Sequence, residues 1–91
     1  MTFIQTCNLP GYVLVQPIPI EIEQEDDGSY LISDTVFNEY GEGDTLEAAR
    51  QDYLLSLAGY YQILKGYATP ENVPSQMQFA QLRAYFVEVD A

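Results

Sequence analysis

The chain has 91 residues, the size of one domain, and 47% of them are apolar, which is too many for a disordered chain. Its 14 Asp and Glu residues against 3 Lys and Arg give a net charge of −11, which disfavours nucleic acid or an anionic membrane as a partner and favours a basic protein. The sequence has no His and a single cysteine, Cys7, so it lacks the commonest catalytic base and metal ligand and cannot form an intrachain disulfide. We therefore expect no enzyme activity, no cofactor and no metal site.

The chain shows no signal for export or membrane insertion. The opening residues, MTFIQTCNLPGY, lack a basic start and a long apolar core, and no run reaches the roughly 18 apolar residues that a membrane-spanning helix needs. No repeat, low-complexity tract or long linker divides the sequence. We expect a cytoplasmic protein with a single domain over residues 1–91.

Residues 11–25 have the pattern of a β-strand. Side chains alternate along its second half, with Ile18, Ile20 and Ile22 on one face and Glu21, Glu23 and Glu25 on the other. Pro17 and Pro19 lack backbone N–H donors on the same edge. This part of the strand is therefore expected to be unpaired on that side, or to join the sheet only after Pro19.

The next elements predict an antiparallel meander. Asp27-Gly28 favours a two-residue type I′ hairpin turn, because both positions of that turn need a positive φ. Residues 29–33 are the predicted return strand, and residues 35–40 are the predicted third strand after a bend at Ser33-Asp34. Such a sheet needs another layer packed on its apolar face.

The sequence GEGDTLEAARQDYLLSLAGYY predicts a long helix that supplies this layer. Gly41 and Gly43 allow a sharp turn. Asp44 is then the predicted N-cap, with Glu47 completing a capping box, and Thr45 is the alternative cap. Apolar residues follow at helical spacing, namely Leu46, Ala49, Tyr53, Leu57, Tyr60 and Leu64, widened by Leu54, Ala58 and Tyr61. Lys65 followed by Gly66 predicts the end of the helix.

The last part of the chain predicts a second, shorter helix. Residues 67–75 contain two prolines and are expected to form a loop, with Ser75 as the N-cap of the helix. Alternation near the C-terminus allows a final strand. The expected fold is α+β, with a three- to four-stranded antiparallel sheet, one long helix packed across one face and a short C-terminal helix.

A run of carboxylates is the candidate partner-binding site. It comprises Glu21, Glu23, Glu25, Asp26 and Asp27. Such a stripe can steer association with a basic partner, although a solvated strand face is the alternative interpretation. Calcium binding by EDDGS is disfavoured because the spacing lacks the ligands of an EF-hand loop. A two-metal nuclease is disfavoured because no acidic constellation converges in the sequence.

Residues 12–65 resemble the HicB-like antitoxin domain. In that family an acidic Asp-Gly turn joins two strands, and a G-x-T-x-E-x-A junction opens a helix after a third strand. The matching positions here are Asp27, Gly28 and Tyr30 at the turn, and Gly43, Thr45, Glu47 and Ala49 at the junction. The family's P-x-L-P-G passage is replaced by DTVFNEYGEG, and Ala48 stands where a second Glu is common.

The resemblance implies a partial ribonuclease H-like fold with a core at about 12–65 and an extension at 66–91. It also implies a protein that binds and blocks a small basic toxin that cleaves RNA. The DNA-binding domain of the family is not expected here, because the extension is short and Arg83 is the only arginine in it.

Two functions therefore follow from the sequence. The first is an antitoxin-like module that sequesters a small basic RNase by occlusion. The alternative is an orphan HicB-like domain that serves as a structural or adaptor subunit with no toxin partner, which predicts an apolar patch away from the acidic strand. In either case a homodimer or higher homo-oligomer is expected, because exposed edges of small sheets readily pair with a second copy.

Overall fold

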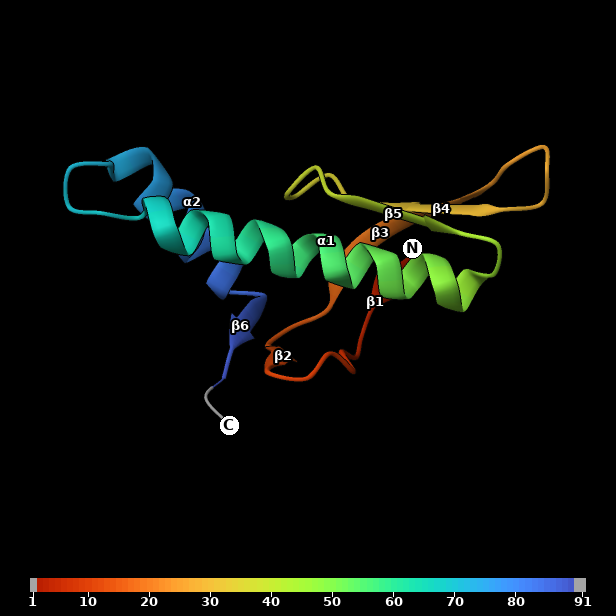
Figure 1. Ribbon diagram of the computed structural model, residues 1–91, viewed down its shortest axis with the longest axis horizontal. Helices are drawn as coiled ribbons and strands as arrows, with labels where there is room; N and C mark the ends of the chain where they lie inside the picture. Colours follow the sequence, from red (N-terminus) through yellow and green to blue (C-terminus); the bar gives the residue numbers. More distant parts are fainter. Residues whose placement is uncertain (1, 90–91) are drawn as a thin grey trace.

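A four-stranded antiparallel sheet and a long helix form the two main layers of the computed structural model, which describes residues 2–89 (Figure 1). The strands are β1 (Thr2–Ile4), β2 (Tyr12–Leu14), β3 (Ile18–Gln24), β4 (Tyr30–Ser33), β5 (Tyr40–Gly43) and β6 (Phe86–Glu88), and the helices are α1 (Leu46–Tyr67) and α2 (Val73–Arg83). The order in the main sheet is β1-β3-β4-β5, and β2 pairs separately with β6. The predicted α+β class, with its long helix and shorter second helix, is confirmed.

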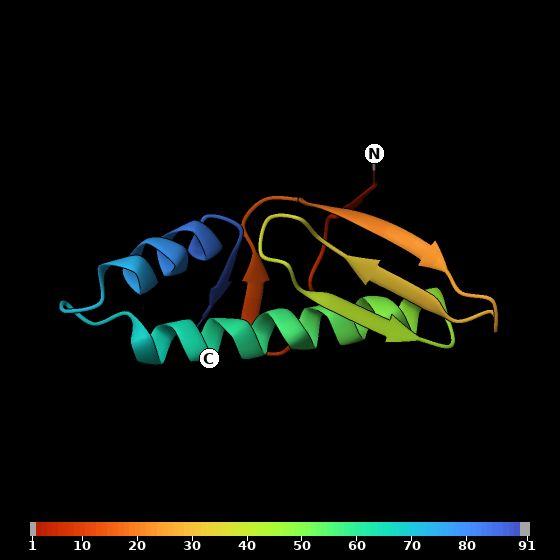
Figure 2. The same ribbon diagram turned by 90° about the horizontal axis from the view of Figure 1, so that it is seen from above.

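The core lies between α1 and the elements on one side of it. Figure 2 shows the sheet beside the N-terminal half of α1, and α2 with the β2–β6 pair beside its C-terminal half. The fully buried side chains of α1 come from the predicted stripe, namely Ala49, Tyr53, Leu54 and Leu57. The stripe begins later than expected, because Leu46 at the helix start is 44% exposed.

Aromatic rings hold the C-terminal half together. Phe86 on β6 stacks on Tyr12 of β2 with ring centroids 5.0 Å apart, and Phe79 of α2 meets Tyr61 of α1 edge to face at 4.9 Å. Such ring pairs add to the stabilisation from burial. Residues 66–91 are thus not a separate appendage, because their described part packs on the same helix as the sheet.

The predicted strand over residues 11–25 is divided between two sheets. Val15 donates its backbone N–H to the Tyr85 carbonyl at 2.6 Å, which directs residues 12–15 toward β6 rather than toward β4. β3 then pairs with β1 at Ile18–Ile20 and with β4 only from Glu21. The expectation that the proline-containing part would be unpaired on one side is confirmed, since β4 ends before it reaches Pro19.

The turn between β3 and β4 has three residues rather than two. Glu25 donates its N–H to the Ser29 carbonyl at 2.8 Å, and Gly28 donates to the Glu25 carbonyl at 3.0 Å. Gly28 has φ 88°, whereas Asp27 is not among the residues with positive φ, so the predicted type I′ turn is wrong. A turn closed by a left-handed glycine is the usual three-residue hairpin, and Gly28 supplies that conformation.

The third strand begins later than predicted. Residues 35–39 form a loop and β5 covers Tyr40–Gly43, so the predicted strand over 35–40 is wrong except at its last residue. The Asp34 carboxylate accepts the backbone N–H groups of Phe37 and Asn38, and Asn38 adopts φ 59°. This local bonding competes with a sheet ladder, because a short acidic side chain offers the backbone an alternative acceptor.

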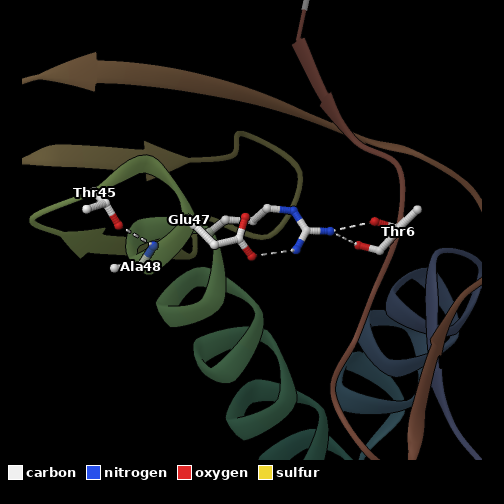
Figure 3. A network of polar contacts seen from close by, with 5 residues as sticks. Thr6, Thr45, Glu47 and Ala48 are labelled. Carbon is white, nitrogen blue, oxygen red and sulfur yellow. Dashed lines mark hydrogen bonds and ion pairs between the residues drawn. The ribbon is translucent and has the colours of Figure 1, made fainter.

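Thr45, not Asp44, caps the N-terminus of α1. Its hydroxyl accepts the Ala48 N–H at 3.0 Å, so the capping box predicted for Asp44 and Glu47 does not form (Figure 3). One turn on, Arg50 lies 3.7 Å from Glu47 and donates to the carbonyl and hydroxyl of Thr6. This arginine ties the segment after β1 to the first turns of the helix.

In the second half of the chain, the C-cap of α1 and the N-cap of α2 differ from the predicted ones. α1 continues through Gly66 to Tyr67 and is closed by Ala68, whose N–H bonds to the Leu64 carbonyl, so the predicted end at Lys65-Gly66 is wrong. Asn72, rather than Ser75, caps α2 by accepting the Ser75 N–H at 3.3 Å. The loop between the helices is correspondingly shorter than the predicted 67–75. Within residues 2–89, neither helix is long and apolar enough to span a bilayer.

Gly41 and Gly43 let β5 lie directly against the backbone of α1. A Cβ placed on Gly41 would lie 2.1 Å from the Tyr53 nitrogen, and one on Gly43 would lie 2.7 Å from the Ala49 nitrogen. These obstacles are helix backbone, which cannot move aside as a flexible side chain can. The glycines before the helix are therefore required for packing and not only for turning the chain.

We expect Gly41→Ala to lower the free energy of unfolding by about 3 kcal/mol or more, because overpacking against backbone forces strand and helix apart. Urea unfolding would measure this loss. Gly66→Ala is the control, since no atom lies within 4 Å of its added Cβ. It should raise stability by up to about 1 kcal/mol through helix propensity. Similar losses in both variants would contradict the close-packing argument.

Candidate functional site

One face of the sheet carries carboxylates and is not covered by a helix. Side chains alternate along a strand, so the face opposite the buried isoleucines of β3 and β4 presents Glu21, Glu23, Leu31, Tyr40 and Glu42. We call these five residues the acidic open face. Figure 2 shows α1 along one side of β3, β4 and β5 and no helix on the other.

The strand register arranges the acidic open face in two rows. Leu31 lies between Glu23 on β3 and Glu42 on β5, and the next row pairs Ser33 with Glu21 and Tyr40. Two strand spacings place Glu23 and Glu42 roughly 10 Å apart, so their charges repel one another across Leu31. Tyr40 is 59% exposed and adds an aromatic surface beside the carboxylates. A cation with an apolar stem matches such a row in both charge and shape.

The five predicted site residues extend from the acidic open face to the hairpin end of the sheet. Glu21 and Glu23 belong to the acidic open face, whereas Glu25, Asp26 and Asp27 lie at the hairpin end of the sheet. Asp27 accepts hydrogen bonds from the Ser29 hydroxyl at 2.6 Å and the Ser29 N–H at 3.0 Å, and these bonds hold the pKa of its carboxyl below the ordinary value. Asp27 thus helps to close the turn, while all five side chains remain exposed.

Sequence reasoning missed Glu42, because its strand was placed too early in the chain. The sequence did contain a signal for Glu42, because it stands between Gly41 and Gly43. If these two glycines face the helix, the residue between them faces the opposite side of the sheet. Its backbone N–H donates to the Asp52 carboxylate at 2.9 Å, so α1 covers part of the outer edge of β5. Homodimerisation by strand pairing is therefore obstructed at this edge.

The acidic open face has no internal counter-ions within residues 2–89. The ion pairs there join Arg50 to Glu47 and Lys65 to Glu88, and Arg83 lies 5.6 Å from the centre of the Phe79 ring. The three basic residues, Arg50, Lys65 and Arg83, thus make these contacts with residues of the helices and of β6, not with the acidic open face. The carboxylates on the sheet side depend on water, salt ions or an external cationic group for compensation.

A shallow hollow of about 570 Å³ lies across β3. Its lining includes Glu21 and Glu23, and it extends from Thr2 on β1 to Asp34 and Thr35 after β4. β1 pairs only with Ile18–Ile20, so no described strand covers the rest of that edge of β3. The hollow and the free edge together offer an extended segment both a surface and backbone hydrogen-bonding groups.

A smaller hollow of about 240 Å³ is lined by Asp27, Glu42 and Asp44, among others. Within the described residues, however, no set of three or more Asp, Glu, Cys or His side chains is arranged to hold a metal ion. The described geometry therefore offers a negatively charged surface rather than a metal centre.

Asp34 anchors the loop that leads into the acidic open face. It is 5% exposed, and besides its two backbone donors it accepts the Tyr53 hydroxyl at 2.7 Å. Burial raises the pKa of Tyr53, and the bond to the Asp34 carboxylate raises it further. Burial also raises the pKa of Glu39, with a contribution from the charge of Asp34. The loop thus brings two acidic groups, Asp34 and Glu39, close to Tyr53 of the helix.

Comparison with family models, with curated proteins and with solved structures finds no match for this chain.

We expect Tyr53→Phe to cost about 1–2 kcal/mol near neutral pH, because Asp34 loses a buried donor. Since the folded-state pKa of Tyr53 is above its ordinary 10.0, the unfolded chain releases this proton first, and stability should fall as pH rises above about 10. Urea unfolding at neutral and alkaline pH should show that the free energy of unfolding falls less steeply with pH in Tyr53→Phe than in the wild type. Tyr40→Phe, at an exposed tyrosine, should retain the wild-type slope, and equal slopes in all three proteins would contradict the assignment.

Proposed function

We propose that this chain is an antitoxin-like protein-binding module, related to the HicB-like domains, that sequesters a small basic ribonuclease by occlusion. The observation that carries the proposal is the acidic open face, on which Glu21, Glu23 and Glu42 have no ion-pair partner within residues 2–89. A ribonuclease needs a cationic surface to hold RNA phosphates. A carboxylate-rich surface that binds the same cations blocks access to RNA without any chemistry of its own.

The shape of the surface supports occlusion by a protein rather than by a small ligand. The hollow across β3 is open to solvent along the sheet, whereas small-molecule sites are usually enclosed. Tyr40 and the half-buried Leu31 supply apolar contact between the carboxylates. An aromatic anchor surrounded by charges is the usual composition of a protein interface with fast, salt-dependent association.

The alternative is an orphan HicB-like domain acting as a structural or adaptor subunit. A specific observation favours it, because an exposed apolar surface lies on α1 away from the acidic strand, at Leu55, Ile63 and Tyr67. The two functions differ in the partner that they require. The first needs a basic protein at the sheet, and the second needs an apolar partner at the helix.

We expect the intact chain to capture a small basic protein from a lysate of its native host at low salt, with weaker retention at physiological salt. The purified partner should cleave RNA, and added wild-type chain should suppress the cleavage. Glu23→Lys should weaken inhibition about tenfold, because it places a cation in the row that the partner binds.

Glu71→Lys is the matched control, since it changes the net charge equally at an exposed residue between the two helices. It should reduce inhibition by less than about twofold. A partner without ribonuclease activity, or equal loss in the two variants, would count against occlusion by the acidic open face. It would favour the adaptor function instead.

A further inference from the structure

The outer face of α1 carries an apolar stripe that nothing in residues 2–89 covers. Leu55, Ile63 and Tyr67 recur at intervals of four or eight residues and are 55%, 58% and 62% exposed. With Gly59 between them, they follow one row of residues four apart, which turns around the helix axis by about 40° at each step, so Leu55, Gly59 and Ile63 are the neighbours at its centre. Figure 2 shows the sheet and α2 on the other side of α1.

No close contact within residues 2–89 requires a glycine at position 59 of the helix. A Cβ added there would meet no atom within 4 Å, and the residue has no left-handed φ. A glycine in a helix interior is nevertheless destabilising relative to alanine. Its missing side chain leaves a notch between Leu55 and Ile63 that allows close approach of a group from outside the chain.

The charge on the molecule restricts what can occupy this notch. Between Asp52 and Glu71 the only charged residue is Lys65, whereas the chain as a whole has a net charge of −11. Two copies brought together at the sheet would place carboxylates against carboxylates. The stripe is a surface at which two such chains can meet without that repulsion.

The stripe is also self-complementary. Leu55 and Ile63 stand four residues before and after Gly59, so a second α1 crossing antiparallel at Gly59 places Leu55 of each copy beside Ile63 of the other. The same register places Asp52 near the turn that contains Lys65, at both ends of the contact. Lys65 bonds to Glu88 on β6 at 2.7 Å, and Asp52 bonds to the Glu42 N–H on β5, so both side chains are directed toward their own chain and the contact between copies depends on the apolar residues.

We propose that two copies of this chain associate through the outer faces of their α1 helices, packed antiparallel with Gly59 at the crossing point. This interface is isologous, because the same patch serves both copies. It lies on the helix and leaves the acidic open face free for a different partner. It is therefore independent of the proposed function.

Sedimentation velocity on the intact chain, from micromolar to millimolar concentration, tests the proposal. The wild type should shift from monomer to dimer, and added NaCl should strengthen the association, because salt screens the repulsion between two acidic chains. Binding of a basic partner at the sheet weakens under the same change. The two proposals can therefore fail separately.

Ile63→Lys should raise the dimer dissociation constant about tenfold or more, because the lysine would lie beside Leu55 of the other copy at both ends of the crossing. Met77→Lys is the matched control, since Met77 on α2 is 68% exposed and the substitution changes the charge equally. It should change the constant by less than about twofold. Circular dichroism should show both variants folded.

Gly59→Gln is a second variant, chosen so that a loss of association could not be attributed to misfolding. It should raise the melting temperature of dilute protein, because glutamine is the better helix former and meets open space. It should also weaken the dimer by filling the notch. A wild type that stays monomeric throughout, a dimer unaffected by Ile63→Lys, or a Gly59→Gln dimer as tight as the wild type would overturn the proposal.

Discussion

The close contact between β5 and α1 is the constraint on which the rest of the structure depends. Because Gly41 and Gly43 have no side chains, the strand lies against the helix backbone at Tyr53 and Ala49. This contact places α1 along one face of the sheet and brings the Tyr53 hydroxyl to Asp34. The opposite face of the sheet is left open, and so is the side of α1 that points away from it. Both candidate binding surfaces are consequences of this single packing arrangement.

The two surfaces differ in charge because the acidic residues are unevenly distributed. Eleven of the 14 Asp and Glu residues lie between positions 21 and 52, and the first 20 residues contain no charged side chain. The sheet and the start of α1 therefore carry most of the negative charge, while the outer stripe of α1 carries little. Binding of a cationic partner to the first surface weakens with salt, whereas association of two acidic chains through the second strengthens with salt, because salt screens their repulsion. A single chain can use both at once.

Some predictions failed because two local patterns competed, and others because the deciding contact joins distant residues. The third strand was placed too early because residues 35–40 have strand-like composition, whereas the buried Asp34 carboxylate folds residues 34–39 into a loop. Asp44 and Thr45 are both good caps, and only the observed bond to the Ala48 N–H distinguishes them. The pairing of β2 with β6 joins residues more than 70 positions apart, at Tyr12 and Glu88. No local periodicity in the sequence predicts such a pairing.

The sequence by itself determined the α+β class, the alternating strand with its carboxylates, the long apolar helix and the charge imbalance. These follow from composition and from periods of two and 3.6 residues, which are local properties of the chain. Tertiary structure alone decided that Glu42 joins Glu21 and Glu23, that β2 pairs with β6, and that Leu55 and Ile63 face outward. Those outcomes depend on strand register and on the side from which the sheet covers the helix, and both are set by contacts between residues distant in sequence.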